Sequence, residues 1–344
     1  MKTIFFGASG SIVKWAYKDV YENPEIEYCE FNKKTIGDTK IRKLLFFSGK
    51  GKLLPYFIKD KLYKNSLNYK FLKSNESEFL FVFTCQFGML FENGFFTYIY
   101  YLKKKYKDCK LAFYYNDIID TCEPSKFEYV KSVFDLVLTF DKKEAEKYKI
   151  KYYGVVHSKC EPAIEETAEE SDVFYVGSDR GRFDTIMETF IRLSDKGKCC
   201  VFYIFELLRE NENKLAEFIK KCKRHGKAFM YKNSLLYVNE YCWYGKTLKY
   251  ISKTKCLVEI LLPEQTAGTL RQAEAVMYGK KLITNCKEAK EKPYYRAENI
   301  FVFDKPEDID VKFLDTTYVH VEYDFSPLKM IEFAKNKLYK EKIK

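Results

Sequence analysis

The stretch that decides the fold is 261–284, LLPEQTAGTLRQAEAVMYGKKLIT. Its pattern predicts the end of a strand, a loop of small residues, a short helix, a glycine stop and a second strand. The loop 266–269, TAGT, lets backbone N–H groups approach a ligand closely. The positive end of the dipole of the following helix favours an anion at the same place.

Two charged side chains follow this loop in the predicted helix. Arg271 would lie in the first helical turn, where a cation is unfavourable unless an anion meets it. Glu274 would lie one turn further on, on roughly the same face, with a carboxylate suited to sugar or ribose hydroxyls. Together these features indicate a nucleotide-sugar site. The alternative is an ordinary strand–helix turn in which Arg271 and Glu274 form an i, i+3 ion pair.

Length and composition favour a two-domain protein. A chain of 344 residues exceeds the size at which a single core stops growing, and 47% hydrophobic residues suffice for two cores. No run of about 18 uncharged apolar residues occurs, so we expect no transmembrane helix, and the N-terminus is interrupted too soon to be a signal peptide. The 11 cysteines lack any C-x-x-C pair, which is typical of a reducing cytoplasm and indicates neither disulfides nor structural zinc.

The net charge of +11 is unevenly distributed along the chain. The segment 40–73 holds ten Lys or Arg residues against one acid, Asp60, with aromatic and aliphatic residues between them. This mixture suits the anionic surface of a cytoplasmic membrane leaflet. The alternative is a solvated basic face of an ordinary domain. We do not expect nucleic-acid binding, because no recognised module is present.

The first half of the chain alternates buried strands with helices. Continuous apolar runs, which are typical of strands covered on both faces, predict strands at 3–6, 79–83, 110–115, 136–140 and 152–156. Helices are expected at 94–107, 124–132 and 142–149. This alternation predicts a first Rossmann-like domain over 1–160.

An acidic stretch, 161–170, then indicates a linker or a surface helix, and the alternation restarts after it. Strands are expected at 173–176, 200–205, 228–231, 256–261, 281–284 and 300–303, and helices at 183–194, 213–223 and 243–252. We therefore expect a second Rossmann-like domain over 161–325. A final basic helix, 326–344, would pack back toward the first domain. The predicted fold class is α/β, with two parallel sheets.

Several motifs carry a family resemblance. They are GSDRGR at 177–182, the helix 243–252 before a strand, GTLRQAEA at 268–275, GKKLIT at 279–284 and, in the first half, FDLVLTFD at 134–141. In this order they resemble bacterial GT-B glycosyltransferases, most of all a group associated with lipopolysaccharide and capsule assembly. The likeness covers most of the second half and the last third of the first.

The resemblance implies that a nucleoside-diphosphate sugar binds the C-terminal domain and that the acceptor faces the N-terminal one. Glu274 matches the second glutamate of the family's paired motif, which contacts the donor ribose, whereas Thr266 stands where the first glutamate is expected. Gly268 and Thr269 would offer backbone N–H groups to the diphosphate, and Arg271 its charge. The donor-binding residues expected on this basis are Gly177, Arg180, Arg182, Gln265, Thr266, Gly268, Thr269, Arg271 and Glu274.

The resemblance also implies that no metal and no further cofactor is needed, because helix dipoles and basic side chains stabilise the leaving diphosphate. Inverting transfer requires a general base for the acceptor hydroxyl. Asp117, just after the strand that ends at Tyr115, is the first candidate, and Asn116 beside it could orient the acceptor. His157, after the last strand of the first domain, is the second candidate.

The sequence therefore predicts a cytoplasmic glycosyltransferase, peripheral at the inner membrane face, that transfers a hexose to a lipid-linked glycan in surface polysaccharide assembly. One alternative is a non-catalytic GT-B-like protein that binds a glycan or scaffolds partner enzymes. Another is a different Rossmann enzyme, such as a nucleotide-sugar epimerase or an NAD-dependent oxidoreductase. The segment 7–10, GASG, lacks the third glycine of a dinucleotide fingerprint.

Overall fold

The computed structural model of the chain describes residues 1–7, 11–30, 40, 53–67, 69–84, 93–119, 124–162, 166–205, 212–263 and 265–340. They form two compact units, the first of Met1–Ser158 with Phe325–Lys344 and the second of Lys159–Asp324. The first unit ends two residues before the predicted limit at 160, and the last helix belongs to it. Within the described ranges, no helix combines the length and apolar character that a membrane crossing requires.

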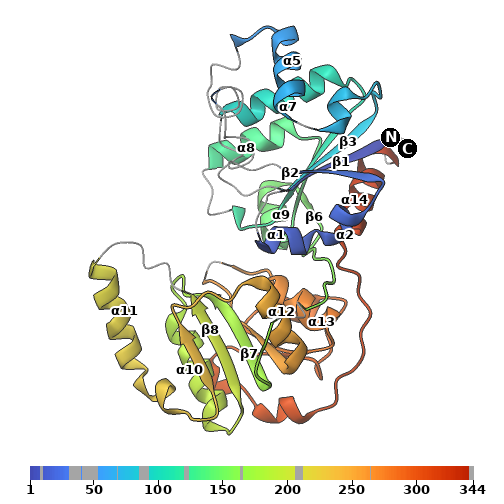
Figure 1. Cartoon of the computed structure of the whole chain (residues 1–344). Coiled ribbons are helices and arrows are strands. Elements are labelled where there is room, and N and C mark those ends of the chain that lie inside the picture. Colours follow the sequence, from blue (N-terminus) through green and yellow to red (C-terminus); the bar gives the residue numbers. More distant parts are fainter. Residues whose placement is uncertain are drawn as a thin grey trace. The chain divides into compact units, whose positions relative to one another are not determined.

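A six-stranded parallel sheet forms the centre of the first unit (Figure 1). In spatial order its strands are β2 (Ile26–Glu30), β1 (Lys2–Gly7), β3 (Phe79–Thr84), β4 (Lys110–Tyr115), β5 (Leu136–Thr139) and β6 (Lys151–Tyr152). Every residue of β3 and β5 is buried, as expected of central strands that helices cover on both faces.

Alternate residues of these strands face two helical layers. Phe6 and Phe83 belong to a cluster with residues of α7 (Asn93–Lys105) and α8 (Pro124–Val133). Phe5 points the other way, with its ring centroid 5.1 Å from that of Tyr17, between α1 (Ser11–Ala16) and α2 (Lys18–Glu22). The remaining helices of this unit are α5 (Tyr56–Ser66), α9 (Lys142–Tyr148) and α14 (Pro327–Lys335).

The final helix is tied to the first unit through a cap. Ser326 is the N-cap of α14, and its hydroxyl accepts a hydrogen bond from the N–H of Leu328. The same hydroxyl donates to Asp19 of α2 over 2.5 Å. The α-helix is shorter than predicted, since it ends at Lys335 and a π-helical turn, Asn336–Lys340, follows.

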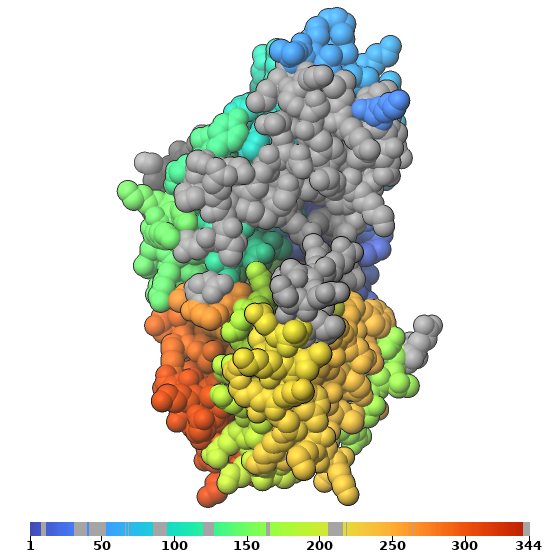
Figure 2. Space-filling view, turned by 90° about the vertical axis from the view of Figure 1, so that its left-hand side faces the viewer, coloured from blue at the N-terminus to red at the C-terminus, as the bar shows by residue number. Residues whose placement is uncertain are grey.

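The second unit repeats this architecture. The spatial order of its parallel strands is β12 (Ile300–Val302), β11 (Lys281–Thr284), β10 (Thr254–Glu259), β7 (Ser171–Ser178), β8 (Cys200–Phe205) and β9 (Leu235–Val238). Its helices are α10 (Phe183–Asp195), α11 (Glu212–Arg224), α12 (Tyr244–Lys253) and α13 (Leu270–Met277). Figure 2 shows the yellow segment that contains α11 covering one face of this unit.

Two predicted strands are wrong. The segment 228–231 lies largely within a 3-10 helix, Gly226–Met230, and the strand that follows is β9, whose residues are all half-buried because β9 lies at the edge of the sheet. The predicted strand 152–156 pairs only at its first residue. Gly154, with φ of 103°, adopts a conformation that extended strands do not use, so the chain leaves the sheet there.

The strand order reverses once in each sheet. From β7 the chain proceeds outward through β8 and β9 and then returns to pair β10 with the other side of β7. In the first sheet the reversal lies between β1 and β3. Ligands of open α/β sheets bind outside the carboxyl ends of the strands at such a reversal. In the second unit this marks the loops after β7 and β10. In the first it marks 8–10, part of the GASG segment, and 85–92, which lie outside the described residues.

Aromatic rings dominate the core of the first unit. Phe6 is fully buried, and its ring centroid lies 4.4 Å from that of Phe83 in a stacked pair. The rings of Phe71 and Tyr98 meet it edge-on at 5.9 and 6.1 Å. Such pairs stabilise a core beyond the burial of their area.

We expect Phe6→Ala to lower the free energy of unfolding of the first unit by about 3–5 kcal/mol, because it removes a buried ring and leaves a cavity. Denaturant unfolding followed by tyrosine and tryptophan fluorescence measures this loss. The control is Phe57→Ala, whose side chain is 72% exposed and whose loss should stay within about 0.5 kcal/mol. Equal losses in the two variants would contradict the placement of Phe6.

Candidate functional site

The predicted donor-binding residues lie at one end of the second sheet. Residues 177–182 end β7 and form the loop before α10, and 265–274 form the loop after β10 and most of α13. Because β7 and β10 are parallel neighbours, their carboxyl ends meet at the same edge. The structure therefore brings both groups of residues to the reversal of strand order.

Glu259, the last residue of β10, organises this end of the sheet. Its side chain is 1% exposed. One carboxylate oxygen accepts hydrogen bonds from the backbone N–H and the hydroxyl of Thr269, over 2.5 and 2.7 Å. The other accepts from Gln272 Nε2 at 2.9 Å and from the hydroxyl of Thr284 at 2.7 Å. The sequence reasoning missed Glu259, although an acid inside the apolar run 256–261 was a usable signal.

Thr269 is the N-cap of α13, and its hydroxyl accepts from the N–H of Arg271 at 3.1 Å. Its own N–H is donated to Glu259, so in this structure it is not open to a ligand. Among the described residues, the N–H groups of Gly268 and Leu270 have no hydrogen-bond partner. The N–H groups that remain free at the start of α13 therefore belong to the two neighbours of Thr269 and not to Thr269 itself.

A glycine is required at position 268 because the Gln272 side chain lies against its backbone. A Cβ at this position would lie 2.1 Å from Gln272 Nε2. The Gln272 carboxamide fits there because glycine leaves the space, and it reaches Glu259 on one side and accepts from the hydroxyl of Tyr294 at 2.8 Å on the other. A larger residue at 268 would displace this carboxamide.

The two other predicted residues of this loop make local contacts. The N–H of Gln265 donates to the Leu262 carbonyl at 3.0 Å, and its Nε2 donates to the Ala267 carbonyl at 2.8 Å. The carbonyl of Thr266 accepts from the Cys286 thiol at 3.3 Å. Both side chains are half-buried, so they fix the loop and remain in part accessible.

Glu274 is fully buried and holds two neighbours. One carboxylate oxygen accepts from the hydroxyl of Tyr244 at 2.8 Å, and the other forms an ion pair with the Arg271 guanidinium. The i, i+3 pair considered as the alternative interpretation is thus present. Burial raises the pKa of the Glu274 carboxyl to about 7, although Arg271 and Tyr244 act to lower it. In this structure the carboxylate of Glu274 positions Arg271 and Tyr244, and it is not accessible to a ribose.

Arg182 joins the ends of the two strands. Its Nε donates to the Ser178 carbonyl at 2.9 Å, and its guanidinium also donates to the carbonyl of Ile260. No carboxylate pairs with it in the part of the chain that the structure describes. Arg180 is exposed, with φ of 40°, and Gly181 follows with φ of 87°. The loop after β7 therefore turns through two left-handed residues before α10 begins.

A buried hydroxyl lies beside Gly177. A Cβ at this glycine would lie 2.5 Å from Tyr175 Oη, and this hydroxyl has no hydrogen-bond partner among the described residues. Burial raises the pKa of Tyr175 to about 12, while the charges of Arg182 and Arg271 act to lower it. The positive charges of both guanidiniums are therefore felt at the Tyr175 hydroxyl. The sequence reasoning did not single out Tyr175.

Asp117 lies just beyond β4 and is exposed, as is Asn116 before it. One oxygen of its carboxylate accepts from the N–H of Ile118 at 2.9 Å. Asp117 therefore presents an accessible carboxylate at the carboxyl end of the first sheet, where a ligand of an α/β unit is expected.

His157, the second candidate base, follows the last strand of the first sheet but is buried. It lies five residues beyond β6, and its side chain is 2% exposed. Its Nδ1 is 2.6 Å from the carbonyl oxygen of Ser158, and its backbone N–H donates to the Phe325 carbonyl at 2.8 Å. The hydrogen bond to Phe325 joins the two chain segments of the first unit, Met1–Ser158 and Phe325–Lys344. Of the two candidate bases, Asp117 is the accessible one.

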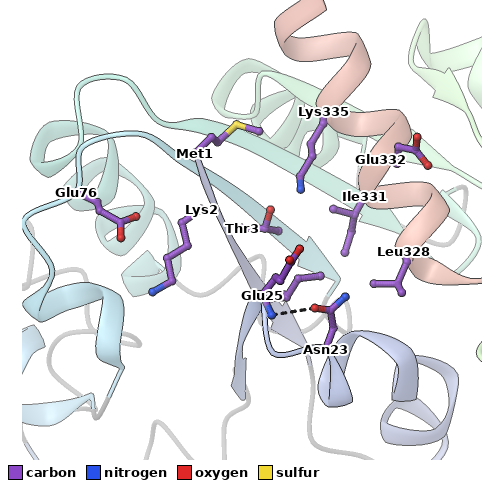
Figure 3. A pocket seen from close by; sticks show the side chains of 11 residues that line it. Met1, Lys2, Thr3, Asn23, Glu25, Glu76, Leu328, Ile331, Glu332 and Lys335 are labelled. Carbon is purple, nitrogen blue, oxygen red and sulfur yellow. Dashed lines mark hydrogen bonds between the residues drawn. The ribbon is translucent and has the colours of Figure 1, made fainter.

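A separate cavity of about 650 Å³ lies at the amino ends of β1 and β2, beside α14 (Figure 3). Three glutamates and two lysines line it, and none of the predicted site residues does. The charged residues around it are Lys2, Glu25, Glu76, Glu332 and Lys335. Since it lies at the amino ends of the strands, we do not assign it to the candidate site. Among the described residues, no group of three or more His, Cys, Asp or Glu side chains could hold a metal.

No protein-family model matches the chain, and no curated protein matches it in sequence. Solved structures are similar in fold. Anabaena HepE in complex with UDP and glucose has a TM-score of 0.52 at 11% identity, over 89% of this chain and 86% of that chain. A putative UDP-N-acetylglucosamine 2-epimerase from Listeria monocytogenes has a TM-score of 0.54 at 8% identity, over 99% and 98%.

An α,α-trehalose-phosphate synthase (UDP-forming) from Burkholderia vietnamiensis has a TM-score of 0.50 at 9% identity, over 92% of this chain and 90% of that chain. At such identities the likeness concerns the fold. Together with the two six-stranded sheets it confirms the predicted α/β class with two Rossmann-like domains.

We expect Glu274→Gln to remove a pH-dependent part of the stability of the second unit. The folded pKa of about 7 lies above the ordinary value of 4.5, so the carboxyl favours the folded state when protonated. This contribution is fully present below pH 4.5 and is lost as the pH rises through 7. Its size is on the order of 3 kcal/mol.

Urea unfolding at a series of pH values from 4.5 to 8 measures the effect. Relative to the wild type, Glu274→Gln should become steadily more stable as the pH rises. The exposed Glu298→Gln in the same unit controls for the loss of one acid. A constant difference between Glu274→Gln and the wild type would show that the carboxyl is not buried as described.

Proposed function

We propose that the chain is a glycosyltransferase that takes a sugar from a nucleoside-diphosphate sugar and transfers it to a glycan acceptor. The observation that carries this proposal is the convergence of Arg182, Arg271 and the start of α13 at the reversal of strand order in the second sheet. We further propose that the acceptor is a lipid-linked intermediate of surface polysaccharide assembly, at the cytoplasmic face of a membrane.

The chemistry of this end of the sheet suits a diphosphate. Arg182 is held by two carbonyls and forms no ion pair in the described chain, and the unused N–H groups of Gly268 and Leu270 add to the positive helix end. Arg271 is held in place by Glu274. Because both guanidiniums are fixed before a ligand arrives, they stabilise the charge of the leaving diphosphate without reorganisation.

The remaining residues take supporting roles in this proposal. Gly177 and Arg180 line the loop after β7, and Gln265, Thr266 and Thr269 shape the loop after β10. Glu274 is a positioning residue for Arg271. The two guanidiniums and the helix dipole supply the positive charge, so we propose transfer without a metal or other cofactor.

UDP is the first nucleotide to test, since two proteins of similar fold, Anabaena HepE and the Burkholderia synthase, are described with UDP or as UDP-forming. The fold likeness to the putative 2-epimerase spans nearly both whole chains and favours a second candidate function, epimerisation of a nucleotide sugar. Both functions use the same diphosphate site, and they differ in whether a glycan acceptor receives the sugar.

We expect one nucleoside diphosphate to raise the thermal stability of the protein. At a hundred times its dissociation constant, a ligand adds roughly 2.7 kcal/mol to the free energy of unfolding. UDP, GDP, CMP, TDP and NAD form the panel. Arg271→Ala and Arg182→Ala should lose most of the shift.

Arg192→Ala is the matched control, because Arg192 lies late in α10 and bonds the Ile309 carbonyl. For each variant, the unfolding temperature with ligand is compared with that of the same variant without ligand. A shift that survives in Arg271→Ala and Arg182→Ala would place the nucleotide elsewhere. No shift with any nucleoside diphosphate would remove the basis of both candidate functions.

We expect Asp117→Asn to slow sugar transfer by about 10²–10⁴-fold, because the carboxylate takes the proton of the acceptor hydroxyl. The nucleotide-induced thermal shift should be unchanged. The assay follows release of the nucleoside diphosphate from its sugar in the presence of a bacterial lipid extract. Full activity of Asp117→Asn would exclude it as the base, and an epimerised nucleotide sugar without transfer would favour the second candidate.

A further inference from the structure

Two unused hydrogen-bond donors converge beside Gly177. Tyr175 Oη is buried and has no hydrogen-bond partner among the described residues. Arg182 donates to carbonyls through Nε and Nη1, so its Nη2 has no partner in the same part of the chain. A Cβ at Gly177 would lie 2.5 Å from Tyr175 Oη and 3.2 Å from Arg182 Nη2, so these two atoms are at most 5.7 Å apart, the sum of the two distances. One ligand oxygen can bridge such a distance with two hydrogen bonds of ordinary length.

Packing of the ring fixes the position of the Tyr175 hydroxyl. The ring centroid lies 5.2 Å from that of Phe202 on the neighbouring strand. The same side chain belongs to the core cluster that contains Phe183 and Ile186 of α10. Buried polar groups in folded proteins are paired as a rule, so the unpaired hydroxyl at the end of this ring needs an explanation other than core packing.

The hydroxyl lies in a region of positive charge. Burial raises the pKa of Tyr175, while the charges of Arg182 and Arg271 act to lower it. The charge of Asp179 acts in the opposite direction to the two arginines, but this carboxylate pairs with Lys221 at 2.8 Å and accepts two backbone N–H bonds. The group that suits the hydroxyl as a partner is therefore an anionic oxygen.

We propose that Tyr175 Oη and Arg182 Nη2 bind one phosphate oxygen of the nucleoside diphosphate, an inference that rests on the proposed function. Both groups donate and the phosphate oxygen accepts. Gly177 is required between them because any side chain there would occupy the space beside the hydroxyl. Gly177 and Arg182 are both half-buried, so this part of the loop after β7 is in part open to solvent.

This assignment divides the diphosphate between the two strand ends. The end of β7 supplies Tyr175 and Arg182 for one phosphate. The start of α13, after β10, supplies Arg271 and the N–H groups of Gly268 and Leu270 for the other. A ribose hydroxyl could also accept from Tyr175, but it is neutral and would make no use of the two guanidiniums.

The test is isothermal titration calorimetry of the full chain with UDP and with inorganic pyrophosphate. We expect Tyr175→Phe to weaken the binding of both ligands by about 10–100-fold, because a hydrogen bond to a charged oxygen is lost. Without ligand, the same variant should unfold at an equal or higher temperature than the wild type, since it removes an unpaired buried hydroxyl. A hydroxyl with a purely structural role would give the opposite result, a lower unfolding temperature with unchanged affinity.

The matched control is Tyr203→Phe in the neighbouring strand β8. Tyr203 is also buried, but its hydroxyl lies 3.2 Å from that of Tyr250, and the variant should bind both ligands as the wild type does. Gly177→Ala supplies a second, independent variant, which should weaken both ligands by filling the space beside the hydroxyl. Combining it with Tyr175→Phe should add little to the larger single loss, because both changes remove the same contact.

The possible outcomes separate this inference from the proposed function. Unchanged affinity of Tyr175→Phe for UDP and pyrophosphate would overturn the inference and leave the proposed function in place. A loss for UDP but not for pyrophosphate would assign the hydroxyl to the ribose or the base, and an equal loss in Tyr203→Phe would show a general effect of the core, so each would also overturn it. If the wild type binds neither ligand, the diphosphate site itself is wrong and the proposed function falls with it.

Discussion

The candidate site depends on one buried carboxylate. Glu259 lies at the end of a buried strand, where an unpaired charge would be costly, and four hydrogen bonds from three side chains and one backbone N–H compensate it. Its donors come from the N-cap of α13, from the first turn of that helix and from the end of β11. The carboxylate therefore fixes the loop after β10 and the direction of α13 relative to the sheet.

The charges of the site follow from that fixed helix. Once α13 is anchored, Glu274 falls in the interior, where it takes the hydroxyl of Tyr244 and the guanidinium of Arg271. Arg182 reaches the same edge from β7 and is held by carbonyls of both strands. Two guanidiniums are thus immobilised at the reversal of strand order by groups other than a ligand, and fixed charges of this kind are what the proposed diphosphate site requires.

Much of the fold could be predicted from the sequence. The limits of β4, β8 and β11 were predicted to the residue, because each contains an apolar run that ends at polar residues or turns. The segment 228–231 was predicted wrongly, because a short apolar run is equally compatible with a 3-10 turn. The sequence singled out the loop after β10 as the candidate site but not Glu259, the buried residue that organises this loop.

By itself the sequence determined the alternation of strands and helices, and hence two parallel sheets, since periodicity and apolar runs depend only on neighbours along the chain. It also placed Arg271 and Glu274 on one helical face. Only the tertiary structure decided that the N–H of Thr269 is donated to Glu259 and that Glu274 is buried against Tyr244. Those outcomes depend on which strands pair and which side chains meet across 10 to 30 positions of the chain, and no local pattern encodes that.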